Sequence, residues 1–181
     1  MIRLNDPIPV LPDMAQGYAV RPIKLDDLHS YTETFSTAFD EKPPFGELIQ
    51  NSLPKGFLCV EYLPTGTVVA SAAAAICKIS QHPNGHSLQW VVAHSDHLGK
   101  RVGQAVISAT TEVLSKYATD YSYLSTDDFR LPAINIYLKL GWQPLLFDEA
   151  QKTRWQKIFA ILKKTFNESD WPKVPPVMSD K

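Results

Sequence analysis

The sequence predicts a mixed α/β domain built around one central sheet, and three observations support this prediction. Segments with strand and helix patterns alternate along most of the chain. Three long strand-like segments, residues 56–63, 67–80 and 86–93, follow one another as an antiparallel meander. Directly after them, the glycine-containing stretch 98-LGKRVGQAVISA-109 opens a segment with helical periodicity.

The chain before the meander is predicted to contain one strand and two helices. Residues 18–23 are typical of a first strand, and Asp26 or Asp27 can cap the helix that follows. One face of that helix carries the apolar residues Leu28, Tyr31, Phe35 and Phe39. Residues 45–53 are predicted to form a second, shorter helix.

The chain after the meander alternates between helices and shorter strands. A helix is predicted from Val102 and a strand over residues 121–126. The next helix ends at Gly141, a residue type favoured at helix C-termini. Residues 144–147 are predicted to form a short strand, and residues 149–166 a last amphipathic helix.

The length and the ends of the chain predict one domain with a tail on each side. The 181 residues are enough for one hydrophobic core. The domain is predicted over residues 17–166, with a proline-containing N-terminal tail over residues 1–16 and a C-terminal tail over residues 167–181.

Charge and hydropathy restrict the partners. The formal net charge is −1, so no overall field attracts nucleic acid or an anionic membrane surface. No stretch of about 18 apolar residues would span a membrane. The N-terminus lacks a cationic start followed by a long apolar run, so no signal peptide is predicted. We therefore expect a cytoplasmic protein that binds neither nucleic acid nor membrane.

The cysteines and histidines do not indicate a metal site. Cys59 and Cys77 lie in apolar segments and are interpreted as buried thiols, without a disulfide framework. His94 and His97 have a spacing that two metal ligands could use, but no third ligand accompanies them. They are interpreted as loop residues, and no metal is expected.

The stretch at residues 98–109 has the chemistry of an anion site. A helix N-terminus offers unpaired N–H groups and a partial positive charge, which suit a phosphate. Glycine lets a ligand approach the main chain closely. The stretch places two glycines and two cations at such a helix start. The alternative interpretation is an ordinary helix start, with surface charges and with glycines that only form a turn. The residues concerned are Gly99, Lys100, Arg101, Val102, Gly103 and Gln104.

Neither of two common phosphate motifs explains this stretch. It lacks the Gly-Lys-Ser/Thr of a P-loop, and its glycine spacing departs from the dinucleotide-binding GxGxxG pattern. The region instead resembles the GNAT superfamily of N-acetyltransferases, whose cofactor motif is approximately Q/R-x-x-G-x-G/A at a helix start. In 98-LGKRVG-103, Leu98 takes the Gln/Arg place, Arg101 the first glycine and Gly103 the second.

A second segment carries the resemblance further. The stretch 130-RLPAINIYLKLGWQP-144 is similar to the family pattern N-x-x-A-x-x-x-Y-x-x-x-G-F. Ala133, Tyr137 and Gly141 match it, Trp142 stands for the phenylalanine, and Arg130 replaces the asparagine. The resemblance covers roughly residues 18 to 148.

The resemblance implies a GNAT-like acyltransferase fold and a site for acetyl-CoA. The fourth and fifth strands of such a fold splay apart, and pantetheine pairs with the fourth, here at Val91, Val92 and Ala93. The diphosphate would lie on the N–H groups of residues 99–104. Arg101 could bind phosphate as well, and Arg130 would either bind phosphate or obstruct the pantetheine. The last helix stands where many relatives have a seventh strand.

The resemblance also implies a catalytic role for Tyr137. A phenol beside the thioester can donate its proton to the leaving CoA thiolate as a general acid. The fourth strand lacks the glutamate that many relatives use as a base. Glu61, Asp127 and Asp128 are the candidates for that role.

These features predict transfer of an acetyl group from acetyl-CoA to a primary amine, on a small molecule or a protein. Asp40, Glu41 and Glu47 could favour a cationic amine near the first two helices. The alternative is a module on the same fold that binds CoA, another anion or a partner without catalysis. The last helix packs either within the chain or in a homodimer.

Overall fold

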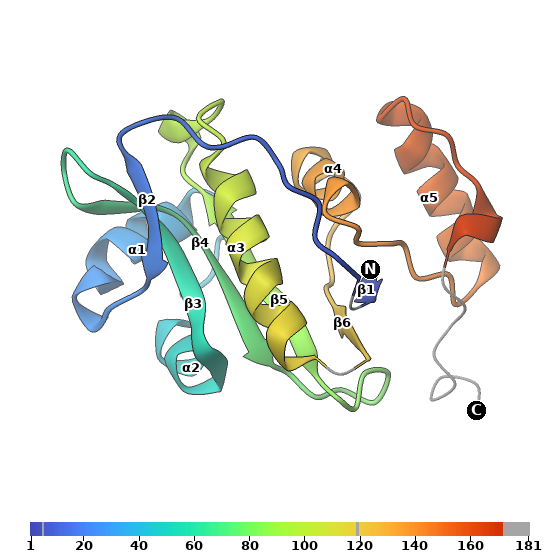
Figure 1. Ribbon diagram of the computed structural model, residues 1–181, viewed down its shortest axis with the longest axis horizontal. Coiled ribbons are helices and arrows are strands. Elements are labelled where there is room, and N and C mark those ends of the chain that lie inside the picture. Colours follow the sequence, from blue (N-terminus) through green and yellow to red (C-terminus); the bar gives the residue numbers. More distant parts are fainter. Residues whose placement is uncertain (5, 119, 172–181) are drawn as a thin grey trace.

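The computed structural model describes residues 1–4, 6–118 and 120–171, and a six-stranded sheet runs through the centre of this part (Figure 1). The strand order is β1-β6-β5-β4-β3-β2. Among the strands of the described residues, only β5 and β6 are parallel neighbours. The strands are β1 (Ile2–Leu4), β2 (Tyr18–Pro22), β3 (Ser52–Tyr62), β4 (Thr67–Ile76), β5 (His86–Ala93) and β6 (Tyr121–Tyr123). The predicted mixed α/β fold with a mainly antiparallel sheet is confirmed.

Helices cover both faces of this sheet. In Figure 1, α3 lies in front of the sheet, and α1 and α2 lie behind it. The side chains of β3 alternate accordingly, because successive residues of a strand point to opposite faces. Leu58 and Val60 join the core under α3, whereas Phe57 and Cys59 join the core under α1. The helices are α1 (Leu28–Ser36), α2 (Phe45–Asn51), α3 (Val102–Tyr117), α4 (Leu131–Lys139) and α5 (Glu149–Ile161).

The N-terminus differs from the predicted tail, because its first residues form a strand. Ile2 pairs with Tyr123 of β6 and is 1 % exposed. Without β1, the outer edge of β6 would present unpaired main-chain groups. Three residues are too few to show an alternating pattern, so the sequence did not reveal this strand. Residues 7–15, here called the N-terminal strap, then cross over α3 to reach β2 (Figure 1).

The predicted strand over residues 144–147 is wrong. Gln143 makes only an isolated bridge to Ile2, and no strand follows it. Because β1 already occupies the outer edge of β6, no place beside that strand is left. The apolar character of the segment has another cause, since Leu145 is buried with Ile2 and Tyr123 in a small core cluster.

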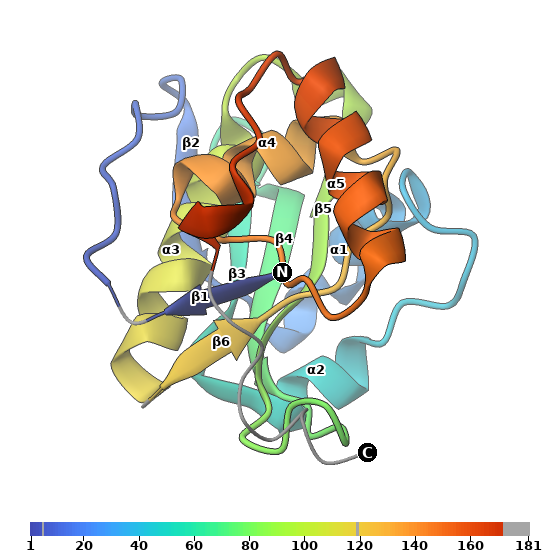
Figure 2. The same ribbon diagram turned by 90° about the vertical axis from the view of Figure 1, so that its right-hand side faces the viewer.

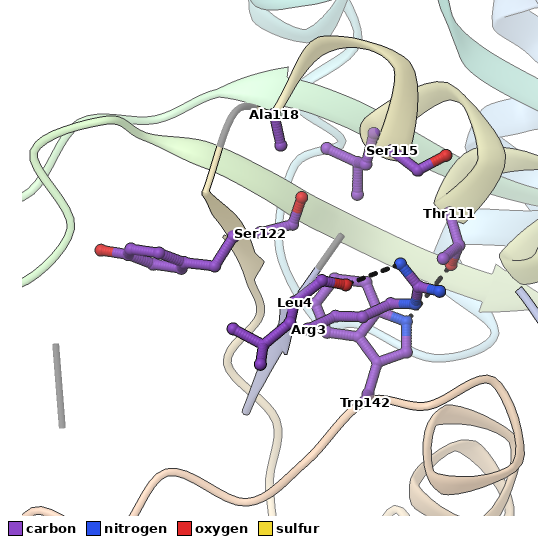
Figure 3. Close-up of a pocket in the computed structure, with 9 residues that line it drawn as sticks. Arg3, Leu4, Thr111, Ser115, Ala118, Ser122 and Trp142 are labelled. Carbon is purple, nitrogen blue, oxygen red and sulfur yellow. Dashed lines mark hydrogen bonds between the residues drawn. The ribbon is translucent and has the colours of Figure 1, made fainter. Parts of the chain in front are cut away.

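Arg3 ties β1 to the end of α4. Its Nε donates a hydrogen bond of 3.0 Å to the carbonyl oxygen of Leu140. Its Nη1 donates to the carbonyl oxygen of Leu4 at 2.9 Å (Figure 3). Beside it, the Trp142 indole donates to Thr111 across 3.3 Å. The cavity between these groups has a volume of about 10 Å³, which is close to the limit for one water molecule. We therefore assign this corner a structural role.

The last helix packs within the chain. Trp155, Ile158 and Phe159 are buried against Ile134 of α4, and α5 stands at the side of the molecule opposite β2 (Figures 1 and 2). The helix ends at Ile161, five residues before the predicted end at residue 166. A homodimer stays a prediction, and the apolar stripe of α5 is not free to form it.

The predicted C-terminal tail begins with a short helical turn, Glu168–Asp170. Trp171 then packs its ring against Trp155 and Phe159 of α5. The rest of the predicted tail, residues 172–181, lies outside the described residues. No helix in the described part of the chain is long and apolar enough to span a membrane.

Candidate functional site

The parallel strands β5 and β6 separate soon after they meet. They share one register position, Ser87 opposite Tyr123. β6 ends at Tyr123, whereas β5 continues to Ala93. Beyond Ser87, no described strand therefore lies along this edge of β5, and the predicted splay is confirmed. Main-chain groups along such an edge are available to a ligand.

A bulge lies in the same part of β5. Gln89 is paired with Ala73 and Val92 with Ser71, so two residues of β5 stand opposite the single Ala72 of β4. The first of them, Trp90, has a φ of 50°, in the left-handed region that is unusual for an aromatic residue. Such strained residues persist where the surroundings hold them, and they cluster at functional sites. The bulge thus sets the direction of the Trp90 side chain.

A cavity of about 390 Å³ lies in the cleft that this separation opens. The volume falls in the range of small-molecule sites. The lining comes from the loop after α1, from the segment after β4, from β5, from β6 with the loop that follows it, and from the start of α4 onward. It includes Phe39, Trp90, Tyr123, Asp127, Arg130 and Tyr137.

Tyr137 brings a buried phenol to this cleft. The residue is 4 % exposed, and its hydroxyl makes no hydrogen bond within the described part of the chain. Burial raises the pKa of Tyr137 well above its ordinary value, and the positive charge of Arg130 opposes this in part. The phenol therefore keeps its proton at neutral pH, in a place where a ligand can receive that proton.

Asp127 and Arg130 form an ion pair on the wall of the cleft. The Nε of Arg130 donates to the Asp127 carboxylate over 3.1 Å. The guanidinium lies over the ring of Phe39, with 4.6 Å from its carbon to the ring centroid. Arg130 thereby spans from the start of α4 to the segment after α1. The sequence-based prediction that it contacts the cofactor stays a prediction.

The start of α3 offers main-chain donors near the end of β5. The N–H groups of Val102, Gly103 and Gln104 have no hydrogen-bond acceptor within the described residues. Gly99 has a φ of 77°, a conformation that glycine adopts easily, and forms the turn before the helix. A Cβ on Gly103 would lie 3.5 Å from the Cβ of Ala93, so the helix start adjoins the last residue of β5.

The side chains around these donors already have partners or face solvent. The Arg101 guanidinium donates to the carbonyl oxygen of Asp13 at 2.9 Å, and the Gln104 amide donates to that of Pro12 at 2.7 Å. Both acceptors belong to the N-terminal strap. Lys100 is exposed, and Val102 is buried in the core. The main chain, more than the side chains, is thus what this turn offers to an anion.

The three candidate bases lie in different places. Glu61 accepts a hydrogen bond of 2.8 Å from Arg21 and belongs to a network on β2 and β3. Asp128 pairs with Arg154 of α5. Only Asp127, among these three, lines the cleft. The structure therefore brings one of the proposed bases to Tyr137 and leaves the other two outside.

The loop histidines and the cysteines also have ordinary roles. His97 Nδ1 lies 2.9 Å from the Tyr18 hydroxyl, and His94 Nδ1 accepts from the N–H of Asp96. The described residues contain no cluster of three metal-ligating side chains. Cys59 is buried as predicted, and burial raises the pKa of its thiol to about 12, which makes it unreactive. Cys77 differs from the prediction, because it is only half-buried and lines the cavity beside Tyr137.

Two aromatic residues of the cleft wall, Phe39 and Trp90, are not evident from the sequence pattern. The helical spacing predicts Phe39 on a helix face, yet α1 ends at Ser36 and Phe39 lines the cavity from the following loop. Trp90 stands in a strand whose other residues give no sign of a bulge. A large aromatic residue between Gln89 and Val91 was the available signal, but it does not distinguish a core position from a cleft.

A family comparison agrees with this fold and geometry. The model of the acetyltransferase (GNAT) family matches residues 25–142, well over half of the chain. The chain therefore belongs to the GNAT acetyltransferase family, as the glycine stretch and the tyrosine segment predicted. No curated protein matches the chain.

Solved structures show the same fold at low identity. An acetyltransferase from Trypanosoma brucei is 21 % identical with a TM-score of 0.52, over 68 % of this chain and 91 % of that one. Glucosamine-6-phosphate N-acetyltransferase from Arabidopsis thaliana is 15 % identical with a TM-score of 0.50, over 65 % and 88 %. Ribosomal-protein-S18-alanine N-acetyltransferase from Escherichia coli is 15 % identical with a TM-score of 0.52, over 68 % and 76 %.

Proposed function

We propose that the protein transfers the acetyl group of acetyl-CoA to the primary amine of an acceptor. One observation carries this proposal. The unpartnered phenol of Tyr137 lines a cleft along the open edge of β5, and the free N–H groups of α3 begin where β5 ends. A thioester at one place and a diphosphate at the other would be joined by a pantetheine arm along that edge.

The residues fit acetyl-CoA in three places. The free N–H groups of Val102, Gly103 and Gln104, at the positive end of the α3 dipole, would hold the diphosphate, and Gly99 would let it approach the preceding turn. The open edge of β5 at Val91, Val92 and Ala93 would pair with the amides of pantetheine. The cavity beside Tyr137 would take the thioester. Lys100 would add positive charge near the diphosphate.

The chemistry follows from these positions. The neutral amine attacks the thioester carbonyl carbon, a C–N bond forms, and the C–S bond breaks. Tyr137 donates its proton to the departing CoA sulfur, and its phenolate is then neutralised by a proton from solvent. The proton lost by the amine passes to Asp127 or to water. The products are an N-acetylated amine and free CoA.

The acceptors named for the structural relatives differ from each other. One relative is named for glucosamine 6-phosphate and another for an alanine of ribosomal protein S18. At 15 % identity, these names support amine acetylation without assigning an acceptor to this chain.

Release of free thiol from acetyl-CoA, measured across a panel of primary amines, tests the proposal. We expect thiol release that depends on the amine, with an acetylated product of matching mass. If the protein binds acetyl-CoA but no amine gives release above the background hydrolysis, the alternative of a non-catalytic binding module replaces the proposal. The absence of a carboxylate on β5 is the observation behind that alternative.

A further inference from the structure

The cleft beside Tyr137 carries balanced charge. Among the described residues that line it, Asp127 is the one carboxylate and Arg130 the one cation. The two are paired at 3.1 Å, so an acceptor meets a positive and a negative group side by side. Asp40, Glu41 and Glu47, which the sequence associated with a cationic acceptor, are exposed and do not line the cavity.

The guanidinium of Arg130 has its outer end free. Asp127 uses only the Nε, and the two Nη groups make no hydrogen bond within the described residues. The side chain is 26 % exposed and is held over the rings of Phe39 and Phe129, at 4.6 and 5.2 Å. A fork of two parallel donors in a fixed position fits a carboxylate in the bidentate manner.

Aromatic rings form the wall next to this ion pair. The centroids of Phe39 and Trp90 lie 5.3 Å apart, and Phe35 fixes both rings from behind at 4.7 and 5.5 Å. The bulge at Trp90 holds its ring in this place. Such a wall favours an apolar or aromatic group, because it removes that group from water without offering further hydrogen bonds.

We propose that the acceptor is an α-amino acid with an apolar or aromatic side chain. The carboxylate of the amino acid binds the free Nη groups of Arg130, its amino group lies near Asp127, and its side chain packs against Phe39 and Trp90. The amino group and the carboxylate of an amino acid are joined to the same carbon, which matches an ion pair with a short separation. This inference rests on the proposed function and specifies its acceptor.

Two other classes of amine fit the cleft less well. A polyamine carries several positive charges and would require several carboxylates, whereas Asp127 is already neutralised by Arg130. An amine without a carboxylate would leave the Nη groups of Arg130 without an acceptor inside a partly desolvated cleft. Hydrogen bonds with charged groups are among the stronger ones, so their loss is costly.

Three probe amines test the inference: L-phenylalanine, 2-phenylethylamine, which lacks only the carboxylate, and spermidine. The kcat/KM for thiol release from acetyl-CoA is measured for each amine with the wild type, Arg130→Gln and Arg154→Gln. Arg154 is a matched control, since it also pairs with a carboxylate but lies on α5 outside the cleft. The Kd of acetyl-CoA for each variant is measured by calorimetry.

We expect L-phenylalanine to exceed 2-phenylethylamine by about tenfold or more in kcat/KM, as for a charge-assisted hydrogen bond. Arg130→Gln should abolish this preference and leave the Kd of acetyl-CoA unchanged, and Arg154→Gln should change neither. If 2-phenylethylamine or spermidine is acetylated as well as L-phenylalanine, the inference is overturned and the proposed function stands. If Arg130→Gln raises the Kd of acetyl-CoA and keeps the preference for L-phenylalanine, Arg130 contacts acetyl-CoA and not the acceptor, and the inference again fails. If none of the three amines gives thiol release above the background hydrolysis, both proposals are overturned.

Discussion

The two halves of the candidate site are built in different ways. The start of α3 presents main-chain N–H groups from a few consecutive residues, and their side chains point into the core, to the strap or to solvent. The cleft beside Tyr137 is formed by side chains from several separate segments, which are spread along the sequence from Phe39 to Tyr137. A main-chain site tolerates changes of side chain, whereas each side chain in the cleft determines what binds there. The departures from the family motif at Leu98 and Arg101 therefore leave the N–H donors in place.

The largest effect is expected when the cleft loses its proton donor. Tyr137→Phe removes one hydroxyl and keeps the buried ring, so the fold and the α3 turn remain. We expect kcat to fall by about 10²-fold or more, since general acid catalysis contributes at least that much. The Kd of acetyl-CoA should change by less than about twofold, because the hydroxyl acts on the leaving sulfur during the reaction and the α3 turn is unchanged. Steady-state kinetics and calorimetry measure the two quantities. Unchanged kcat on a confirmed acceptor would remove Tyr137 from its assigned role.

A second prediction concerns the support of the cleft. Arg3→Met leaves the carbonyl oxygen of Leu140, at the end of α4, without its donor. We expect a loss of about 2 kcal/mol in the free energy of unfolding, from an unsatisfied buried acceptor. The main-chain site at α3 should keep its affinity for acetyl-CoA.

Denaturant unfolding measures this loss, and Lys139→Met is the matched control. Lys139 is exposed on α4, so the same change of side chain there should cost little. Equal losses for the two variants would contradict the role given to Arg3.

A pair of glycine substitutions distinguishes two uses of glycine in the α3 turn. Gly99 has a φ of 77°, so Gly99→Ala should lower the free energy of unfolding by about 1 kcal/mol, although a Cβ there meets nothing. The φ of Gly103 is not in the left-handed region, and a Cβ there would make an ordinary contact of 3.5 Å with the Cβ of Ala93. Gly103→Ala should therefore change the free energy of unfolding by less than about 0.5 kcal/mol. A change in the affinity for acetyl-CoA in Gly103→Ala can then be attributed to the binding site, whereas in Gly99→Ala it would be mixed with a loss of stability. A reversed order of the two losses would show that the turn differs from this description.

The smallest effect concerns pH. A general acid works while it is protonated, and burial raises the pKa of Tyr137 above the ordinary value of 10.0. We therefore expect kcat to hold as the pH rises to about 10, where an ordinary tyrosine would lose half of its protons. A pH profile with saturating substrates measures this. A fall in kcat below that pH, present in the wild type and absent in Tyr137→Phe, would contradict the buried position of the phenol.

The sequence was sufficient for the features that depend on local pattern. The meander, the long helix from Val102 and the tyrosine helix each have a clear periodicity, and the glycine turn has a local chemistry. Features that depend on distant contacts were missed. The strand Ile2–Leu4 forms by pairing with the outer edge of β6, which is distant in the sequence. Because this edge is then occupied, residues 144–147 do not form the predicted strand beside it.

The same limit applied within the cleft. Tyr137, Val91 and Arg130 were predicted to be part of the site, and all three line the cavity. Phe39 and Trp90 were not, because a loop after α1 and a bulge in β5 bring them there. Which of the three candidate bases reaches the cleft was equally a question of tertiary contacts. Their ion-pair partners, Arg21, Arg130 and Arg154, lie on different elements.

Calorimetric titration of acetyl-CoA into the wild type and Gly103→Glu tests the central claim most directly. A carboxylate at the start of α3 would repel the diphosphate and occupy its place, while the backbone there accepts a side chain. Lys116→Glu, at the exposed far end of α3, is the control for added negative charge, since it changes the net charge by −2 and Gly103→Glu by −1. We predict saturable one-to-one binding to the wild type and to Lys116→Glu, and none to folded Gly103→Glu. Absence of binding to the wild type, or equal affinity in Gly103→Glu, would contradict the account.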